Sequence, residues 1–204
     1  AKDKHPVFVW IYGGGLSSGS SNCDIYDGEE MAKQGVIFVS LNYRVGVLGF
    51  MAHPELSANA AYQASGNYGF LDQIAALKWF QQNIDAFGGD PGNVTIAGQS
   101  AGAFSVNTLI ASPLAKGLFH KAILQSGGLL SNRLQQNLET AEQAGVRFME
   151  VAGANSIADL RKMPAEQIQA ISNDTAVGRF GVTLDGYVLP EDLMGHFEKG
   201  QHQQ

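Results

Sequence analysis

Residues 93–102 read Asn-Val-Thr-Ile-Ala-Gly-Gln-Ser-Ala-Gly, which places a Gly-x-Ser-x-Gly pentapeptide between two different apolar patterns. The run 93–97 is typical of a buried strand, and the apolar residues after Gly102 recur at helical spacing. A strand that turns sharply into a helix forces its central residue, here Ser100, into strained dihedral angles and leaves room only for glycine on either side. The stretch therefore predicts an α/β architecture with Ser100 at a helix N-terminus.

Ser100 in that position could be a nucleophile or an ordinary helix cap. The free N–H groups and the dipole of a helix N-terminus favour negative charge, which suits an attacking alkoxide and the oxyanion that it creates. Glycine and serine are nevertheless common wherever a strand leads into a helix. The pentapeptide alone leaves both interpretations open.

A second motif, Tyr12-Gly13-Gly14-Gly15, follows the apolar run 6–11. Three consecutive glycines expose backbone N–H groups, which can form an oxyanion hole or a phosphate-binding loop. A Walker loop does not fit because Ser20 stands where lysine is required, and a dinucleotide fingerprint does not fit because Ser18 replaces its last glycine. Acyl transfer fits better, with N–H groups of this loop and of Ala101 directed at one developing oxygen charge.

Together with three further motifs, these two resemble the type-B carboxylesterase family, the branch of the α/β-hydrolases that includes the cholinesterases. The five motifs are Tyr12–Gly15, Asn42–Gly46, Gly66–Gln73, Phe87–Pro91 and Val94–Gly102. The resemblance runs from Val7 to Ser126 and continues more loosely to Gly200. It implies an α/β-hydrolase fold with a central, mostly parallel sheet and helices on both of its faces.

The resemblance also implies a carboxylic-ester hydrolase that works through a serine acyl-enzyme and requires no cofactor. Carried over by position, Ser100 is the nucleophile and the oxyanion donors are Gly14, Gly15 and Ala101. The expected substrate is a small-molecule carboxylic ester. The alternatives are an inactive fragment and a noncatalytic esterase-like binding module, although such modules usually lose the serine or its glycines, and both are intact here.

Residues beside the nucleophile add detail. The resemblance places Gln99 and Ser126 next to the catalytic groups. The family more often has glutamate where Gln99 stands, so a neutral amide here makes cationic substrates such as choline esters less favourable. Arg44 and Asp72 lie in family motifs, and we expect them to hold loops by hydrogen bonds or a salt bridge.

An active member also needs an acid and a histidine, in the chain order serine, acid, histidine. The resemblance places the glutamate after the segment Leu184–Pro190 and beyond Gln204, with the histidine farther still. A substitute triad of Asp185 with His196 or His202 is disfavoured, because too few residues separate them for the strand, helix and strand between acid and base loops. The chain is therefore expected to carry the nucleophile and oxyanion hole without their partners.

Four apolar strands form the expected core of the sheet. The family order places the strands at Val36, Val7, Val94 and Ala122 side by side. The first and last are apolar on both faces and lack the charge or proline that protects a natural edge. We therefore expect N- and C-terminal parts of the same polypeptide to cover them.

The domain prediction is one domain, incomplete at both ends. Residues 1–130 form the α/β core segment, and residues 131–204 form a mainly helical cap segment that leads back to the core. Four features predict helices: an apolar stripe in the core segment, an amphipathic stripe after Gly128, a capping box, and a proline that opens a last helix. The core stripe comprises Phe70, Ile74, Leu77, Phe80, Ile84 and Phe87, with Trp79 also in the core. The amphipathic stripe comprises Leu134, Leu138, Ala141, Phe148 and Val151. The capping box is Ser156 with Asp159, and the proline is Pro164.

Composition agrees with an α/β enzyme segment. The 204 residues are 45% hydrophobic and 16% charged, with a formal net charge of -6. No basic run favours nucleic acid or an anionic membrane, no apolar stretch reaches the length of a membrane span, and the five histidines lack metal-ligand spacing. The single cysteine, Cys23, cannot form an internal disulfide, which suits a bacterial member and leaves cytoplasmic and secreted locations open.

Overall fold

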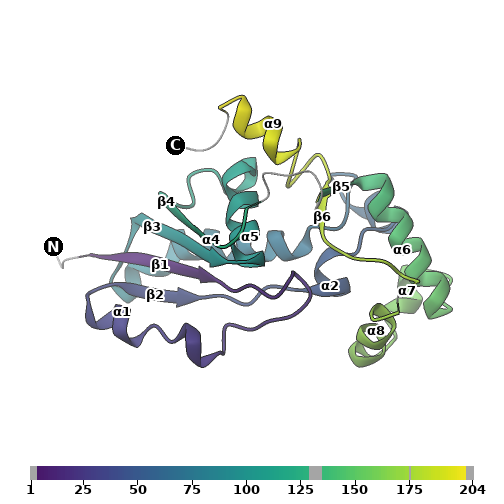
Figure 1. Ribbon diagram of the computed structural model, residues 1–204, viewed down its shortest axis with the longest axis horizontal. Coiled ribbons are helices and arrows are strands. Elements are labelled where there is room, and N and C mark those ends of the chain that lie inside the picture. The colour runs from purple at the N-terminus through teal and green to yellow at the C-terminus, as the bar shows by residue number, and fades with distance from the viewer. Residues whose placement is uncertain (1–3, 129–134, 175, 201–204) are drawn as a thin grey trace.

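A computed structural model of the chain describes residues 4–128, 135–174 and 176–200. Its centre is a four-stranded parallel sheet in the order β2-β1-β3-β4 (Figure 1). The strands are β1 (His5–Ile11), β2 (Ile37–Ser40), β3 (Gly89–Gln99) and β4 (Lys121–Gln125). This order confirms the arrangement expected from the sequence.

On one face of the sheet, the side chains of the two central strands are buried under two helices. Val7 pairs with Val94 and Val9 with Ile96 in the β1–β3 register, and all four side chains are buried. Against them pack α4 (Tyr68–Asn83), which continues as a short 3-10 helix (Ile84–Phe87), and α5 (Ala101–Ala111). A further 3-10 turn (Pro113–Ala115) leads from α5 towards β4. Apolar burial of this kind is the main stabilising contribution to such a core.

The opposite face carries a lighter cover. Phe8 and Phe38 lie in register on neighbouring strands and stack with ring centroids 5.8 Å apart. A 3-10 turn (Asp24–Tyr26) brings the Tyr26 ring within 5.4 Å of Trp10, and α1 (Glu29–Lys33) begins beside Gly28, which lies against Phe38. Elements therefore lie on both faces, as expected.

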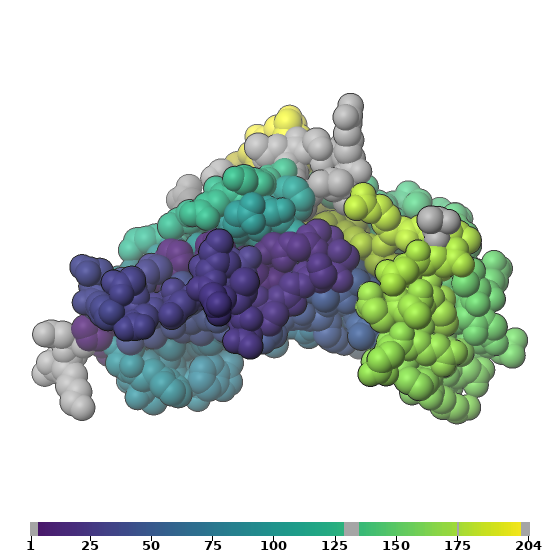
Figure 2. Space-filling model, turned by 60° about the horizontal axis from the view of Figure 1, so that its bottom comes forward, coloured from purple at the N-terminus to yellow at the C-terminus, as the bar shows by residue number. Residues whose placement is uncertain are grey.

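Figures 1 and 2 show α6 (Leu138–Ala152), α7 (Ile157–Leu160) and α8 (Ala165–Ser172) in green and yellow-green at one end of the molecule, beside the N-terminal segments in purple and blue. Helix α6 contacts a two-stranded parallel sheet of β5 (Gln135–Asn137) and β6 (Val182–Leu184). The other described helices are α2 (Gly46–Phe50), α3 (Pro54–Asn59) and α9 (Leu193–Glu198), which follows β6. The domain boundary predicted at 130/131 falls outside the described residues and stays a prediction.

The capping box and the proline start predicted in this region are confirmed. The Ser156 hydroxyl oxygen accepts a hydrogen bond from the Asp159 N–H at the start of α7, as the capping box predicted. Pro164 is the N-cap of α8. Of the stripe predicted after Gly128, Ala141 and Phe148 are buried in α6, whereas Leu134 lies outside the described residues.

Two core predictions were wrong. Trp79 is 47% exposed and Phe87 is 63% exposed, with their ring centroids 6.0 Å apart at the surface. The helix tightens to 3-10 geometry after Asn83, and the change from 3.6 to 3.0 residues per turn rotates Phe87 away from the stripe that Ile84 still completes. Val151 lies in the last turn of α6, within the helix that the stripe predicted, and is 42% exposed.

The outer strand β4 leaves apolar side chains uncovered. The apolar side chains of Ile123 and Leu124 are 40% and 38% exposed to solvent. A strand edge of this kind is a template for further pairing.

None of the described helices combines the length and apolar character that a membrane span requires.

Candidate active site

Ser100 occupies the sharp turn between β3 and α5. Its backbone has φ 56° and ψ -120°, a conformation that few residues other than glycine adopt, and its side chain makes no capping hydrogen bond to α5. An ordinary serine cap has extended backbone angles and accepts a hydrogen bond from the first turn. The backbone at Ser100 is therefore strained without serving as a helix cap.

The two flanking glycines are required by close backbone contacts. A Cβ atom on Gly102 would lie 2.0 Å from the carbonyl oxygen of Ile11, and one on Gly98 would lie 2.4 Å from the backbone of Gly102. Any side chain at either position would push the start of α5 away from β1. The sequence motif thus marks the place where helix and strand touch.

The glycine loop lies directly against this turn. A Cβ atom on Gly13 would be 3.2 Å from the Ser100 Cβ and 2.7 Å from the Gln99 carbonyl oxygen. Gly14 and Gly15 follow with φ of 113° and 65°, both in the region that favours glycine, and both are exposed. The structure therefore places the glycine loop beside the Gly-x-Ser-x-Gly turn, as the predicted site requires.

The N–H groups of the predicted oxyanion donors are free for a ligand. Among the described residues, those of Gly14 and Gly15 donate no hydrogen bond to another backbone or side chain. The Ala101 N–H belongs to the first residue of α5, where an N–H has no partner within the helix. Free N–H groups on two neighbouring elements can together bind an oxyanion.

Two tyrosines anchor the glycine loop from below. Tyr12 and Tyr43 are buried and their rings stack with centroids 4.6 Å apart. The Tyr43 hydroxyl donates to the Tyr12 carbonyl at 2.9 Å, and the Tyr12 hydroxyl donates to the Tyr43 carbonyl at 3.2 Å. Burial, reinforced by the neighbouring Tyr12, holds the pKa of Tyr43 well above its ordinary value, so this hydroxyl keeps its proton and stays a donor.

A buried polar pair supports the first turn of α5. Gln73 of α4 donates through Nε2 to the Ser105 hydroxyl at 3.1 Å, and that hydroxyl donates to the Ala101 carbonyl at 3.1 Å. All three residues are fully buried. This chain of hydrogen bonds ties α4 to the turn that follows Ser100, and the sequence analysis missed it.

Behind the serine lies the end of β4. The Ser100 N–H donates to the Gln125 carbonyl at 2.9 Å, and Gly127 packs against the Ser100 carbonyl and the Phe104 ring. Ser126 is exposed and, with φ 51°, is itself in the left-handed region. Gln99 and Ser126 thus both lie beside the turn; their roles in catalysis stay predictions.

The expected ion pair between Arg44 and Asp72 is present. Arg44 donates through Nε and Nη2 to the two carboxylate oxygens of Asp72, both at 2.8 Å, and through its backbone N–H at 3.0 Å. Its guanidinium also lies 5.3 Å from the ring centroid of Tyr68. The pair joins the loop after Tyr43 to α4, the structural role predicted for it.

The described histidines and acids do not assemble a triad with Ser100. Asp185 accepts three backbone N–H bonds, from Tyr187, Val188 and Leu189, and so holds its own turn. The Nδ1 of His196, in α9, lies 3.4 Å from Oε1 of Glu191, which precedes that helix. Within the described residues no histidine is hydrogen-bonded to the Ser100 hydroxyl, and His202 lies outside them. No group of three His, Cys, Asp or Glu that could hold a metal ion occurs in the part of the chain described.

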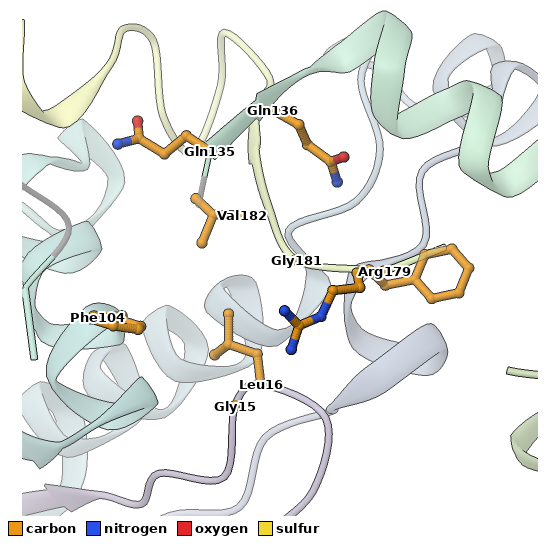
Figure 3. Close-up of a pocket in the computed structure, with 9 residues that line it drawn as sticks. Gly15, Leu16, Phe104, Gln135, Gln136, Arg179, Gly181 and Val182 are labelled. Atoms are coloured by element: carbon orange, nitrogen blue, oxygen red, sulfur yellow. The ribbon is translucent and has the colours of Figure 1, made fainter. Parts of the chain in front are cut away.

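A pocket of about 300 Å³ opens beside the glycine loop (Figure 3). Gly15 and Leu16 form one wall, Phe104 of α5 another, and β5 with the loop into β6 the rest. Phe104 is one helical turn beyond Ser100, to whose carbonyl its N–H donates at 3.0 Å. The lining residues are Gly15, Leu16, Phe104, Gln135, Gln136, Arg179, Phe180, Gly181 and Val182.

Comparison with known proteins agrees with this geometry. The profile of the carboxylesterase family matches residues 1–203. The chain belongs to the carboxylesterase family. It is 44% identical over 198 residues to a fumonisin B1 esterase of Sphingopyxis macrogoltabida, covering 96% of this chain and 36% of that protein.

Two further relatives give the same result. The chain is 42% identical over 199 residues to a para-nitrobenzyl esterase of Bacillus subtilis, covering 92% of this chain and 39% of that protein. It superimposes on a Geobacillus stearothermophilus carboxylesterase with a TM-score of 0.86 and 40% identity, covering 98% of this chain and 42% of that one. The α/β-hydrolase fold is therefore established, and the chain spans about two fifths of the length of these carboxylesterase relatives.

Proposed function

We propose that this carboxylesterase-family chain contributes the nucleophile and the oxyanion hole of a serine carboxylic-ester hydrolase of type B. The observation that carries the proposal is the backbone of Ser100. Strain of this kind costs about 1–3 kcal/mol, and here it is not offset by a capping hydrogen bond. The strained backbone is explained if it holds the Ser100 hydroxyl clear of the helix as a nucleophile.

The reaction follows from the groups around Ser100. Its hydroxyl oxygen attacks the ester carbonyl carbon, and the N–H groups of Gly14, Gly15 and Ala101 stabilise the negative charge on the carbonyl oxygen. The carbon–oxygen bond to the alcohol then breaks, the alcohol leaves with a proton, and the acyl group stays on Ser100. Water attacks this acyl-enzyme and releases the carboxylic acid.

The proton of Ser100 needs a base, which we propose lies in a part of the polypeptide that this chain does not span. Two observations support this: Asp185 and His196 are engaged elsewhere, and the chain spans only 36% to 39% of two esterase relatives. In the chain order of the family an acid follows the serine, and a histidine follows the acid. The same missing parts would cover the exposed apolar residues of β4.

The proposed substrate is a small-molecule carboxylic ester, the class that the relatives' names share. Gln99 places a neutral amide beside the turn, which gives no attraction to cationic alcohols. No nucleic-acid or membrane partner is proposed.

The test is esterase activity of the complete polypeptide on 4-nitrophenyl acetate and butyrate. Ser100→Ala should lower kcat by at least about a thousandfold, because only the oxyanion hole and substrate binding then remain. Ser172→Ala, in the distant helix α8, is the matched control and should keep the wild-type rate. A phosphonate inhibitor should label the peptide that contains Ser100.

Full activity in Ser100→Ala, or phosphonate labelling on another residue, would exclude Ser100 as the nucleophile. A complete polypeptide that hydrolyses no ester, while remaining folded, would favour the noncatalytic binding module.

A further inference from the structure

Arg179 is the only charged residue among those that line the pocket beside the glycine loop. Figure 3 shows its guanidinium extending from the loop before β6 into the pocket, towards Leu16. The other lining side chains are apolar apart from the amides of Gln135 and Gln136. The pocket therefore presents one positive charge on a largely apolar wall.

This guanidinium has no carboxylate partner among the described residues. The ion pairs found there involve other groups, and no Asp or Glu lines the pocket. An arginine offers five donors in a rigid fork that matches the two oxygens of a carboxylate. In a chain with a net charge of -6, an unpaired arginine inside a pocket is a local site for an anion.

The pocket adjoins the proposed reaction site on two sides. Gly15 lies in the wall and is also a proposed oxyanion donor, and Phe104 lies one helical turn from Ser100. A substrate whose ester carbonyl reaches Ser100 would thus extend past Gly15 and Phe104 into the pocket. Gln135 lines the pocket with its side-chain stem only: its Oε1 accepts the Leu193 N–H at 3.2 Å, and Figure 3 shows its amide directed away from Arg179.

We propose that Arg179 selects esters that carry a free carboxylate in addition to the ester group. This inference rests on the proposed function of Ser100 and names the substrate class of that same site. The guanidinium pairs with the free carboxylate, orients the ester towards Ser100, and favours anionic over neutral esters. Charge-assisted pairing of this kind is stronger than a neutral hydrogen bond.

The test compares esters that differ only in charge. For an anionic acyl group, the pair is the mono-4-nitrophenyl ester of glutaric acid and its terminal amide. For an anionic alcohol, the pair is 3-carboxyphenyl butyrate and 3-carbamoylphenyl butyrate. The quantity measured on the complete polypeptide is the ratio of kcat/KM for the anionic ester to kcat/KM for its neutral amide.

Arg179→Gln should lower that ratio by about tenfold for one of the two pairs, mainly through a higher KM. Arg179→Lys should retain part of the preference, because it keeps the charge and loses the fork. Arg161→Gln, which removes an exposed arginine outside this pocket, is the matched control and should leave the ratio unchanged. Raising the ionic strength should also reduce the wild-type ratio.

The pair that responds shows whether the carboxylate sits on the acyl or the alcohol side. An equal ratio in wild type and Arg179→Gln for both pairs would overturn the inference, while hydrolysis of the neutral amides would leave the proposed esterase function intact. If no ester is hydrolysed, the proposed function fails, and calorimetric titration with glutarate decides the anion site separately. Weaker glutarate binding in Arg179→Gln would support the site, and equal binding would remove it.

Discussion

The Tyr43 hydroxyl donates a hydrogen bond to the carbonyl oxygen of Tyr12, the residue at which β1 gives way to the glycine loop. Both tyrosines are buried, so this carbonyl has no water to replace the bond. The direction in which the loop leaves the sheet, and with it the position of Gly14 and Gly15, depends on this contact.

Replacing Tyr43 by phenylalanine removes that donor while keeping the stacked ring. An unsatisfied buried carbonyl costs about 1–3 kcal/mol, so the free energy of unfolding should fall by that amount in urea denaturation. The kcat for ester hydrolysis should fall as well, because the proposed oxyanion donors lose their support. Tyr26→Phe, whose hydroxyl makes no hydrogen bond among the described residues, is the control; equal losses in both variants would show that the Tyr43 hydroxyl is not special.

Replacing Gly102 by alanine should destabilise the protein, although alanine is the better helix former. The new methyl group would lie 2.0 Å from the Ile11 carbonyl oxygen, so α5 must move away from β1. Overpacking of this kind costs about 1–3 kcal/mol, which exceeds the helix propensity gained. Gly128→Ala is the control, because a Cβ there meets nothing within 4 Å. Unchanged stability and kcat in Gly102→Ala would remove the steric explanation of the motif.

The sequence predicted the order of the four central strands and the meeting of the two glycine motifs. The existence of the strands and the meeting of the motifs rest on short-range signals: apolar runs mark buried parallel strands, and glycine marks positions where a side chain cannot fit. The resemblance then supplied the strand order, which no local pattern contains. For Gly98 and Gly102 the structure identifies the backbone atoms that a side chain would strike.

Contacts that depend on three-dimensional packing could not be read in this way. Trp79 and Phe87 follow the apolar pattern of a buried helix, but the pattern does not tell where the covering layer ends. Arg179 lies in an irregular loop without periodicity, so nothing in the sequence indicates that it reaches the glycine loop. The partnership of Gln73 with Ser105 likewise joins two helices that are distant in the chain.

Replacing Asp72 by asparagine should weaken the link between the loop after Tyr43 and α4. Asparagine removes the negative charge, so one Arg44 side-chain hydrogen bond keeps only a neutral oxygen as its acceptor, and the other guanidinium donor faces an amide N–H₂ group. Because the Arg44 side chain is 53% exposed, we expect a loss of only about 1 kcal/mol in the free energy of unfolding. The exposed pair of Lys33 and Glu30 serves as the comparison, since Glu30→Gln should change stability barely measurably. A loss for Asp72→Asn no larger than that of Glu30→Gln would show that the bidentate geometry adds nothing.

His53 should make folding stability depend on pH. It is the N-cap of α3, its Nδ1 accepts the Glu55 N–H at 3.0 Å, and protonation would abolish that acceptor. Burial lowers the pKa of His53 below its ordinary value near 6.5, and the negative charges of Glu55 and Glu142 oppose this shift only in part. The unfolded chain therefore binds a proton at a higher pH than the folded protein does. Stability should consequently fall as the pH drops through about 6.5 and level off below the folded pKa.

His53→Asn isolates this effect, because asparagine can accept the same N–H bond and does not titrate. The measurement is the free energy of unfolding in urea at several pH values between 7.5 and 5. Other groups contribute equally to both proteins, so the wild type should lose more stability than His53→Asn over this range. The variant starts from a lower stability because it fills less of the buried site, and only the difference in slope tests the prediction. Parallel curves would show that the pKa of His53 is the same in the folded and unfolded states. The contribution of the cap to stability would then not depend on pH.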